Sequence, residues 1–228
     1  MTGISIWRCE MQKRRVAILI SGRGSNMTAL IEAAKAEDFP AQIVLVVSNI
    51  ANAAGLAIAA KHGIETLTIE SKPFGRDREA FERAMQSALA ERNIELVCLA
   101  GFLRLLTPWF VQQWDKRMLN IHPALLPSYR GLHTHERALA DGVKIHGATV
   151  HFVVPEMDSG PIVMQGAVAV RDDDTPDTLA ARVLSVEHRI YPDALRLVAG
   201  GKTTLEGGHC RTDASGSPDD ALISPSII

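Results

Sequence analysis

Asparagine, histidine and proline are concentrated in one stretch of the chain, MLNIHPALLPSYRGLHTHERAL, at residues 118–139. Asn120 and His122 stand two residues apart, so both side chains point to the same side if a strand runs through them. An amide can donate hydrogen bonds, and an imidazole can take up or release a proton near neutral pH. The pair therefore predicts a site that stabilises a developing oxyanion and moves a proton, with a satisfied turn as the simpler alternative.

His133 and His135 raise a second possibility, a zinc site shared with His122. Zinc sites in proteins usually combine cysteine with histidine, or use an HExxH helix, and neither pattern accompanies these residues. We therefore predict that no metal is bound, and that both side chains belong to a polar loop wall or to the start of a helix.

Asp158 lies in PEMDSGP, a segment with proline at each end and Gly160 within it. Aspartate in such a segment is usually a turn former. The alternative is that Asp158 faces His122, orients the imidazole ring and stabilises its positive charge. The two residues are far apart in the sequence, so the pattern alone leaves both interpretations open.

A glycine-rich turn, SGRGSN at residues 21–26, follows a short apolar run and precedes a helical pattern. Gly24, Ser25 and Asn26 would present backbone N–H groups at a helix N-terminus, which favours a phosphate, although the turn alone can require glycine. The residues after Gly24 exclude the Gly-Lys-Ser/Thr of an ATP loop. Met27 stands where a dinucleotide site needs a small residue, and the second strand ends without an acidic residue. A small phosphorylated ligand therefore fits better than ATP or NAD.

Short β-branched runs alternate with amphipathic segments over most of the chain. Strands are expected at residues 16–20, 42–47, 65–69, 95–100 and 118–121, and helices at 27–36, 53–62 and 77–92. This alternation predicts an α/β, Rossmann-like fold, a mostly parallel central sheet with helices on both faces. Asn120 and His122 then lie at the carboxyl end of a strand, where open α/β sheets bind their ligands.

The pattern changes in the last third of the chain. Two strand-like runs, at 146–153 and 161–170, follow each other without a helix, so we expect an antiparallel pair. A long amphipathic helix is expected at 175–197. Residues 1–12 look like an N-terminal extension, and the Gly-, Ser- and Asp-rich residues 207–228 predict a disordered C-terminal tail.

Composition and charge argue against several classes of protein. A formal net charge of −2 over 228 residues does not suit a general binder of nucleic acid or of membrane surfaces. No apolar run reaches the roughly 18 residues that a membrane span needs, and the N-terminus lacks an apolar signal core. The 3 cysteines are widely spaced, which indicates neither a disulfide framework nor a cysteine metal site. We expect a cytoplasmic protein, whose oligomeric state stays open, with a homodimer among the candidates.

Five segments in order along the chain resemble one family, the phosphoribosylglycinamide formyltransferases: ISGRGSNM, SNIANAAGL, LAGFLRLLTP, NIHPALLPSYRGLHTH and HGATVHFVVPEMDSGP. The resemblance is nearly continuous from about Val16 to Leu197 and implies a formyltransferase domain at residues 13–206. It implies transfer of a formyl group from 10-formyltetrahydrofolate, a co-substrate, to the amine of phosphoribosylglycinamide in purine synthesis. No metal takes part in the chemistry that this family implies.

The same resemblance implies roles for individual residues. The catalytic set is Asn120, His122 and Asp158, and the substrate phosphate lies at Gly24, Ser25 and Asn26. Folate contacts are implied for Arg78, Leu103, Arg104, Leu105, Leu106 and Asn120, and a contact with the glycinamide substrate for Glu187. In this interpretation GLHTH supports the wall of the active site.

Other classes of protein share parts of this pattern. A formyltetrahydrofolate deformylase would hydrolyse the formyl group. The resemblance implies a further N-terminal domain for such an enzyme, and the expected first strand begins at residue 16 here. A methionyl-tRNA formyltransferase would carry a tRNA-binding C-terminal domain, whereas this tail is acidic. A non-catalytic folate or phosphoribosyl binding protein could lose Asn120, His122 or Asp158, and all three are present.

Overall fold

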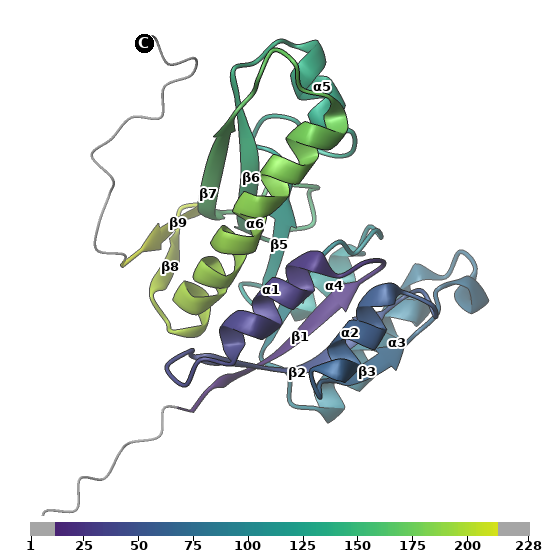
Figure 1. Cartoon of the computed structure of the whole chain (residues 1–228). Coiled ribbons are helices and arrows are strands. Elements are labelled where there is room, and N and C mark those ends of the chain that lie inside the picture. Colours follow the sequence, from purple (N-terminus) through teal and green to yellow (C-terminus); the bar gives the residue numbers. More distant parts are fainter. Residues whose placement is uncertain (1–11, 214–228) are drawn as a thin grey trace, which may run out of the picture.

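A seven-stranded sheet with helices on both faces forms the body of the protein in a computed structural model, which describes residues 12–213 (Figure 1). Its strands are β1 (Arg14–Ile20), β2 (Ala41–Ser48), β3 (Glu65–Thr68), β4 (Leu96–Leu99), β5 (Met118–His122), β6 (Ile145–Phe152) and β7 (Ile162–Ala169). The helices are α1 (Ser25–Ala34), α2 (Ala54–Lys61), α3 (Arg78–Glu91), α4 (Pro108–Gln113), α5 (Thr134–Ala140) and α6 (Pro176–Ala199), with a 3-10 helix, η1 (Lys72–Phe74). The predicted alternation is confirmed, and α4 and α5 are additions to it.

Strand order fixes where a ligand can bind. The order is β3-β2-β1-β4-β5-β6-β7, so the chain reverses direction across the sheet between β1 and β4. Strands β1 to β5 pair in parallel, whereas β6 is antiparallel to both β5 and β7, which confirms the predicted strand pair. In open α/β sheets a crevice forms at the carboxyl ends of the strands beside such a reversal.

Both faces of the sheet carry apolar side chains because helices cover the central strands on each face. In β1, Val16, Ile18 and Ile20 pack with one core cluster, while Ala17 and Leu19 pack with the other. Helices α1 and α6 run side by side across the first face (Figure 1), and α3 and α4 cover the second. Burial of this apolar surface is the main favourable term in folding, and it holds the strand ends in place.

Helix α6 approaches the sheet at a glycine. A Cβ atom on Gly166 of β7 would lie 2.2 Å from Cγ1 of Val186 and 3.0 Å from Cγ2 of Ile190, both on α6. The helix begins with a capping box between Thr175 and Thr178, which satisfies backbone donors of its first turn. The helix axis is thus fixed at its start by the cap and along its length by close contact with β7.

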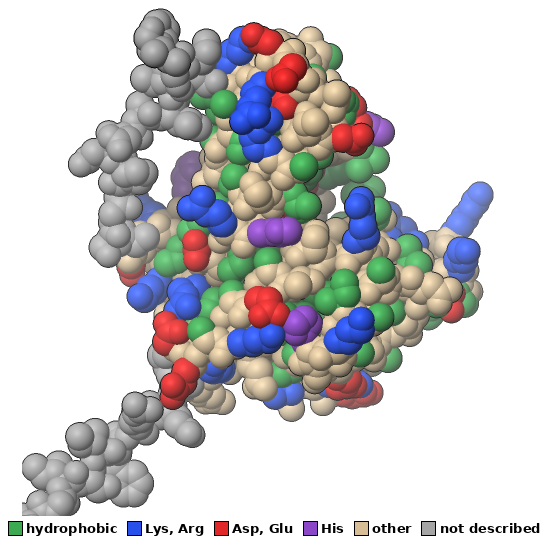
Figure 2. All heavy atoms as spheres, in the orientation of Figure 1, with side chains coloured by type: hydrophobic (Ala, Val, Ile, Leu, Met, Phe, Trp, Pro, Cys, Tyr) green, Lys and Arg blue, Asp and Glu red, His purple; other side chains and the backbone are tan. Residues whose placement is uncertain are grey.

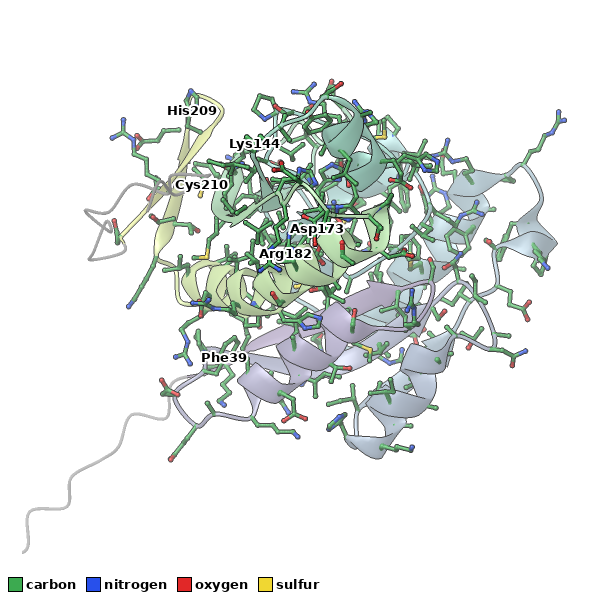
Figure 3. All side chains as sticks on the ribbon, turned by 45° about the horizontal axis from the view of Figure 1, so that its top comes forward. Phe39, Lys144, Asp173, Arg182, His209 and Cys210 are labelled. Atoms are coloured by element: carbon green, nitrogen blue, oxygen red, sulfur yellow. The ribbon has the colours of Figure 1, made fainter. Side chains whose placement is uncertain are left out.

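The C-terminal region corrects one prediction. Strands β8 (Thr203–Glu206) and β9 (His209–Thr212) form an antiparallel hairpin that contacts β7, so the prediction of an unstructured tail from Gly207 is wrong for His209–Thr212. Figure 3 shows His209 and Cys210 on this hairpin, beside the edge of the sheet. The rest of the predicted tail beyond 213, and residues 1–11 of the predicted extension, lie outside the described residues.

Charged side chains of both signs are mixed on the visible surface. On the face shown in Figure 2, positive and negative side chains are interspersed over the elements and do not gather by sign. Within residues 12–213, no helix combines the length and the hydropathy that spanning a membrane would require.

Candidate active site

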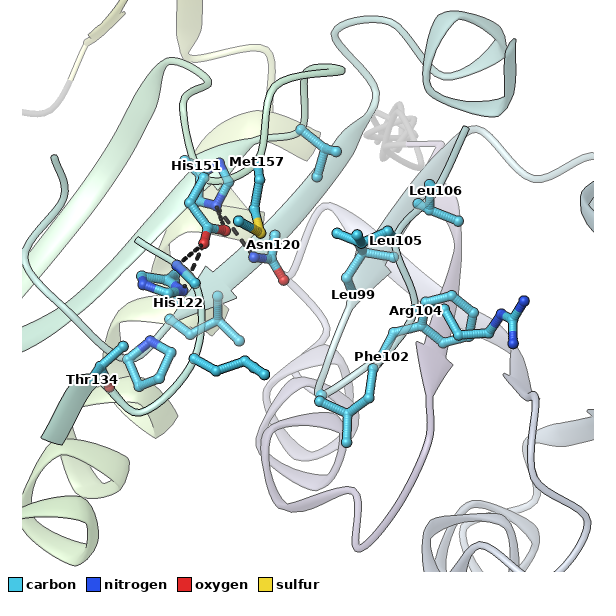
Figure 4. Close-up of a pocket in the computed structure, with 18 of the residues that line it drawn as sticks. Leu99, Phe102, Arg104, Leu105, Leu106, Asn120, His122, Thr134, His151 and Met157 are labelled. Carbon is cyan, nitrogen blue, oxygen red and sulfur yellow. Dashed lines mark hydrogen bonds and ion pairs between the residues drawn. The ribbon is translucent and has the colours of Figure 1, made fainter. Parts of the chain in front are cut away.

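A cleft of about 910 Å³ opens at the carboxyl ends of β4 and β5, where the topology places a ligand site. Figure 4 shows Asn120 and His122 on one side of it and the segment from Phe102 to Leu106 on the other. Asn26, Asp158 and Glu187 also line the cleft, so residues from every predicted group meet there. The volume lies within the range of small-molecule sites.

Asn120 is oriented by a histidine that the sequence did not single out. The amide Nδ2 of Asn120 lies 3.2 Å from Nε2 of His151, its register partner on β6. Nδ1 of His151 is 2.9 Å from the carbonyl oxygen of Phe152, which can only accept, so Nδ1 carries the proton and Nε2 accepts from Asn120. Burial lowers the pKa of His151, in agreement with a neutral ring. One N–H of the amide is thereby used, and the second is available to the cleft.

His122 is held between a carbonyl group and a carboxylate. Its Nε2 lies 2.9 Å from the carbonyl oxygen of Tyr129, so Nε2 is a donor there. Its Nδ1 lies 3.4 Å from Oδ2 of Asp158, and both side chains are nearly buried. Protonation of Nδ1 would therefore place an imidazolium beside a carboxylate. The predicted juxtaposition of His122 and Asp158 is present in the fold.

Asp158 occupies a strained and crowded turn. Its φ is 50°, in the left-handed region that few residues other than glycine adopt, and aspartate and asparagine tolerate it best among the others. Oδ2 accepts a hydrogen bond of 2.8 Å from the backbone N–H of Gly131, which ties this turn to the loop after β5. A Cβ atom on Gly160 would lie 1.8 Å from the carbonyl oxygen of Phe152, so the turn needs glycine there. Turn formation and orientation of His122 are thus compatible roles of Asp158.

A buried amide–carboxyl pair forms the end of the cleft against α1 and α6. Nδ2 of Asn26 donates to Oε2 of Glu187 at 2.5 Å, and both residues are buried. Burial raises the pKa of Glu187, and the bond from Asn26 opposes that shift. Oδ1 of Asn26 is buried without a hydrogen-bond partner, so it has capacity for a donor from a ligand.

Gly24 has a structural explanation of its own. It has a φ of 75° before the first turn of α1, and a Cβ atom there would lie 3.0 Å from Cα of Gly55. Only Asn26 of the three predicted phosphate residues lines the cleft, whereas Gly24 and Ser25 precede it in the turn. The turn therefore satisfies the folding requirement, and its use for a phosphate stays a prediction.

The predicted folate segment contributes an apolar wall. Leu103 is 76% exposed and Leu105 is 64% exposed, and both line the cleft together with Leu106. Large exposed apolar side chains beside a cleft are typical of a surface that a ligand covers. The guanidinium of Arg104 stacks 5.1 Å from the ring centre of Phe81. Arg78 lies outside the cleft lining and donates to the carbonyl oxygen of Leu105.

His133 and His135 do not converge with His122 on a common point. Residues 12–213 contain no group of three or more His, Cys, Asp or Glu arranged to hold a metal ion. The ring of His135 packs edge-on against His146 at 5.3 Å, and burial lowers the pKa of both, to about 4 for His146. His133 is the residue before α5, which agrees with the predicted helix start.

Cys98 is unsuited to act as a nucleophile. It lies on β4 with no exposed surface, and burial raises the pKa of its thiol to about 12. This position agrees with the strand expected at residues 95–100.

Comparisons with known proteins give a consistent result. The formyl transferase family model matches residues 14–195. The human trifunctional purine biosynthetic protein adenosine-3 is 49% identical over 196 residues, which are 86% of this chain and 19% of that protein. The phosphoribosylglycinamide formyltransferase of Escherichia coli (strain K12) is 43% identical over 190 residues, or 83% of this chain and 89% of that enzyme. The crystal structure of phosphoribosylglycinamide formyltransferase from Brucella melitensis is 52% identical with a TM-score of 0.80, covering 83% of this chain and 97% of that one.

Proposed function

The chain belongs to the formyl transferase family, and from this we propose that it transfers the formyl group of 10-formyltetrahydrofolate to the amine of 5-phosphoribosylglycinamide. The products are the N-formylated acceptor and tetrahydrofolate, and the reaction is a step of purine biosynthesis. The chain spans about a fifth of the length of the trifunctional relatives, so only this one activity is proposed for it. The observation that carries the proposal is one cleft lined by Asn120, His122 and Asp158, by the apolar wall and by the Asn26–Glu187 pair.

Asn120 has the position of an oxyanion donor in this reaction. When the acceptor nitrogen attacks the formyl carbon, negative charge develops on the formyl oxygen. Asn120 lines the cleft, His151 leaves one N–H of its amide free, and the same histidine fixes the orientation of that amide. A donor whose position is fixed before the reaction stabilises the developing charge without reorganisation.

His122 acts together with Asp158. Its Nε2–H already donates to the Tyr129 carbonyl, and its Nδ1 faces the Asp158 carboxylate. The attacking amine must lose a proton, and the folate nitrogen must gain one when its bond to the formyl carbon breaks. Nδ1 of His122 and the carboxylate of Asp158 are the paired groups that can carry that proton.

Two groups of residues that line the cleft suit the two substrates. Leu103, Leu105 and Leu106 offer an apolar surface to a flat folate ring, while Asn26 and Glu187 offer polar groups to the acceptor. Binding energy from these remote contacts would hold the amine near the formyl carbon.

Release of tetrahydrofolate tests the proposal directly. Purified protein is mixed with 10-formyltetrahydrofolate, with and without 5-phosphoribosylglycinamide, and tetrahydrofolate is followed by absorbance. Release that requires the acceptor supports the transferase. Release without the acceptor would identify a deformylase, and no release in either mixture would favour a non-catalytic binding protein.

A further inference from the structure

The segment from Gly101 to Thr107 connects β4 to α4 and carries the apolar wall of the cleft. It contains no helix or strand, so its conformation depends on contacts with the rest of the fold. Its exposed side chains, Leu103 and Leu105, do not hold it against the core, whereas Phe102 and Leu106 are partly buried against it. Hydrogen bonds from other parts of the fold to its backbone supplement that packing.

Three side chains hold this segment from outside. Near its start, the backbone N–H of Leu103 donates to Oγ of Ser21 at 2.9 Å. Near its middle, Arg78 at the first turn of α3 donates to the carbonyl oxygen of Leu105. At its end, Glu82 of α3 accepts from Thr107 twice, from the backbone N–H at 2.7 Å and from the hydroxyl group.

The carboxylate of Glu82 is unusual for its position on α3. The side chain is 1% exposed and lies on the buried face of the helix with Phe81 and Met85. A buried carboxylate is costly, and an apolar residue of similar size would pack there at a lower cost. Thr107 already caps α4 through its hydroxyl oxygen, so the helix end does not need a carboxylate. Both oxygens of Glu82 are instead directed at the last residue of the wall segment.

We propose that Glu82 is a positioning residue for the folate co-substrate, because it fixes the end of the Gly101–Thr107 segment and so forms the apolar wall before folate binds. The inference rests on the proposed function, which assigns folate to this side of the cleft. Figure 4 shows Leu105, Leu106 and Arg104 along this wall, opposite Asn120. A wall formed in advance spares the ligand the free energy of ordering the segment.

The proposal predicts a selective loss of folate binding. If only a fraction of molecules has the wall in place, the apparent Kd for folate rises by the inverse of that fraction. We expect Glu82→Gln and Thr107→Val each to raise the Kd for tetrahydrofolate, and the KM for 10-formyltetrahydrofolate, about tenfold, as expected for the loss of a hydrogen bond to a charged group. The KM for the phosphoribosyl acceptor and kcat at saturating folate should change less than about twofold, because neither residue lines the cleft.

Thr107→Ser and Gln86→Met are the matched controls. Serine retains the hydroxyl group, so this variant should keep folate binding near that of the wild type. Gln86 lies one turn after Glu82 on α3 and accepts from Nε1 of Trp114, the residue after α4, at 2.8 Å. Gln86→Met therefore removes a hydrogen bond between the same two helices without touching the wall segment.

Calorimetric titration with tetrahydrofolate, together with steady-state kinetics for both substrates, decides the matter. The result that supports the proposal is a raised folate Kd in Glu82→Gln and Thr107→Val, with Thr107→Ser and Gln86→Met near wild type. An unchanged folate Kd in folded Glu82→Gln and Thr107→Val would overturn it, as would an equal loss in Gln86→Met. Formyl transfer by the wild-type protein is scored separately, so failure of the proposed function is distinguished from failure of this inference.

Discussion

The parallel half of the sheet and the antiparallel half contribute different kinds of groups to one cleft. The parallel half, β1 to β4 with α1 to α3, supplies Asn26, in the first turn of α1, and the Gly101–Thr107 segment, a loop after β4. The antiparallel half, β5 to β7 with α5, supplies Asn120 and His122 from a strand itself and Asp158 from the turn between β6 and β7. Segments that follow parallel strands thus line the proposed binding surfaces, and the proposed reacting groups come from a strand and a turn of the antiparallel half.

Burial of titratable groups separates the two halves further. His122, His146 and His151 are all buried in the antiparallel half, where each ring packs against or hydrogen bonds another group. Among the described residues of the parallel half, Glu82 is the buried carboxylate, and it acts on a loop. Under the proposed function, the chemistry relies on side chains fixed by neighbouring strands, and folate binding relies on a loop fixed from the adjacent helix.

Loss of Asn120 or His122 should give the largest effect, on the antiparallel side. We expect Asn120→Ala and His122→Ala each to lower kcat by at least roughly 10²-fold, the scale for losing one oxyanion donor or one positioned proton carrier. Single-turnover and steady-state rates measure this directly. Near-wild-type turnover in both variants would contradict the proposal that the antiparallel half carries the reacting groups.

Removal of the Asp158 charge should give a smaller loss. Asparagine at this position could keep the left-handed backbone and the bond from Gly131, so Asp158→Asn mainly removes the charge beside His122. We expect kcat to fall about tenfold to a hundredfold, as for the loss of a charged hydrogen-bond partner, measured by steady-state kinetics. An unchanged rate would leave Asp158 as a turn former.

Acid should destabilise the antiparallel half through His146. Burial lowers its folded pKa to about 4, with His135 and His122 nearby as further positive charges when protonated. Because the folded pKa lies below the unfolded value, this contribution to stability is complete above about pH 6.5 and is lost as pH falls toward about 4. The loss from pH 7 to pH 5 should be at most about 2 kcal/mol in the free energy of unfolding.

Urea unfolding at several pH values checks this effect. His146→Phe keeps an aromatic ring against His135 but cannot be protonated, so its free energy of unfolding should fall less between pH 7 and pH 5. Equal pH dependence in the variant and the wild type would contradict the assignment.

Asn26→Ala should give the smallest effect, confined to acceptor binding on the parallel side. The change removes the partner of Glu187 and the unpaired Oδ1, so we expect the KM for 5-phosphoribosylglycinamide to rise about tenfold, which corresponds to about 1.4 kcal/mol. Steady-state kinetics with varied acceptor measure it. Thr28→Val is the control, because Thr28 bonds to the Gly24 carbonyl in the same turn without lining the cleft. A similar rise in both variants would assign the effect to the turn and not to the amide.

The main features of the fold were predictable because its strands and long helices have clear patterns. Helices α4 and α5 were missed because six and seven residues are too few for a helical period to show. The β8–β9 hairpin was missed although Gly207 and Gly208, both with positive φ, are the two-residue turn that such hairpins favour. The composition of the following residues obscured that signal.

The site was predictable where chemistry is local and not where it depends on pairing. Residue type and spacing made Asn120 and His122 a candidate pair with a satisfied turn as the alternative, and their catalytic assignment rested on the family resemblance. Asp158 meets His122 only because β6 turns back beside β5, and His151 meets Asn120 only through antiparallel register. Neither relation is visible in sequence spacing.

Gly166 sets the distance between helix α6 and strand β7. Because α6 rests directly on that glycine, the volume of residue 166 sets how far the helix stands from β7. Glu187 follows Val186 on this helix and lines the cleft. A larger side chain at position 166 would therefore move the Glu187 carboxyl group away from the sheet and enlarge the cleft beside it. Substitution of Gly166 is therefore a way to make room for a bulkier amine in the proposed acceptor site. Gly166 does not line the cleft, so none of the proposed reacting residues needs to be changed.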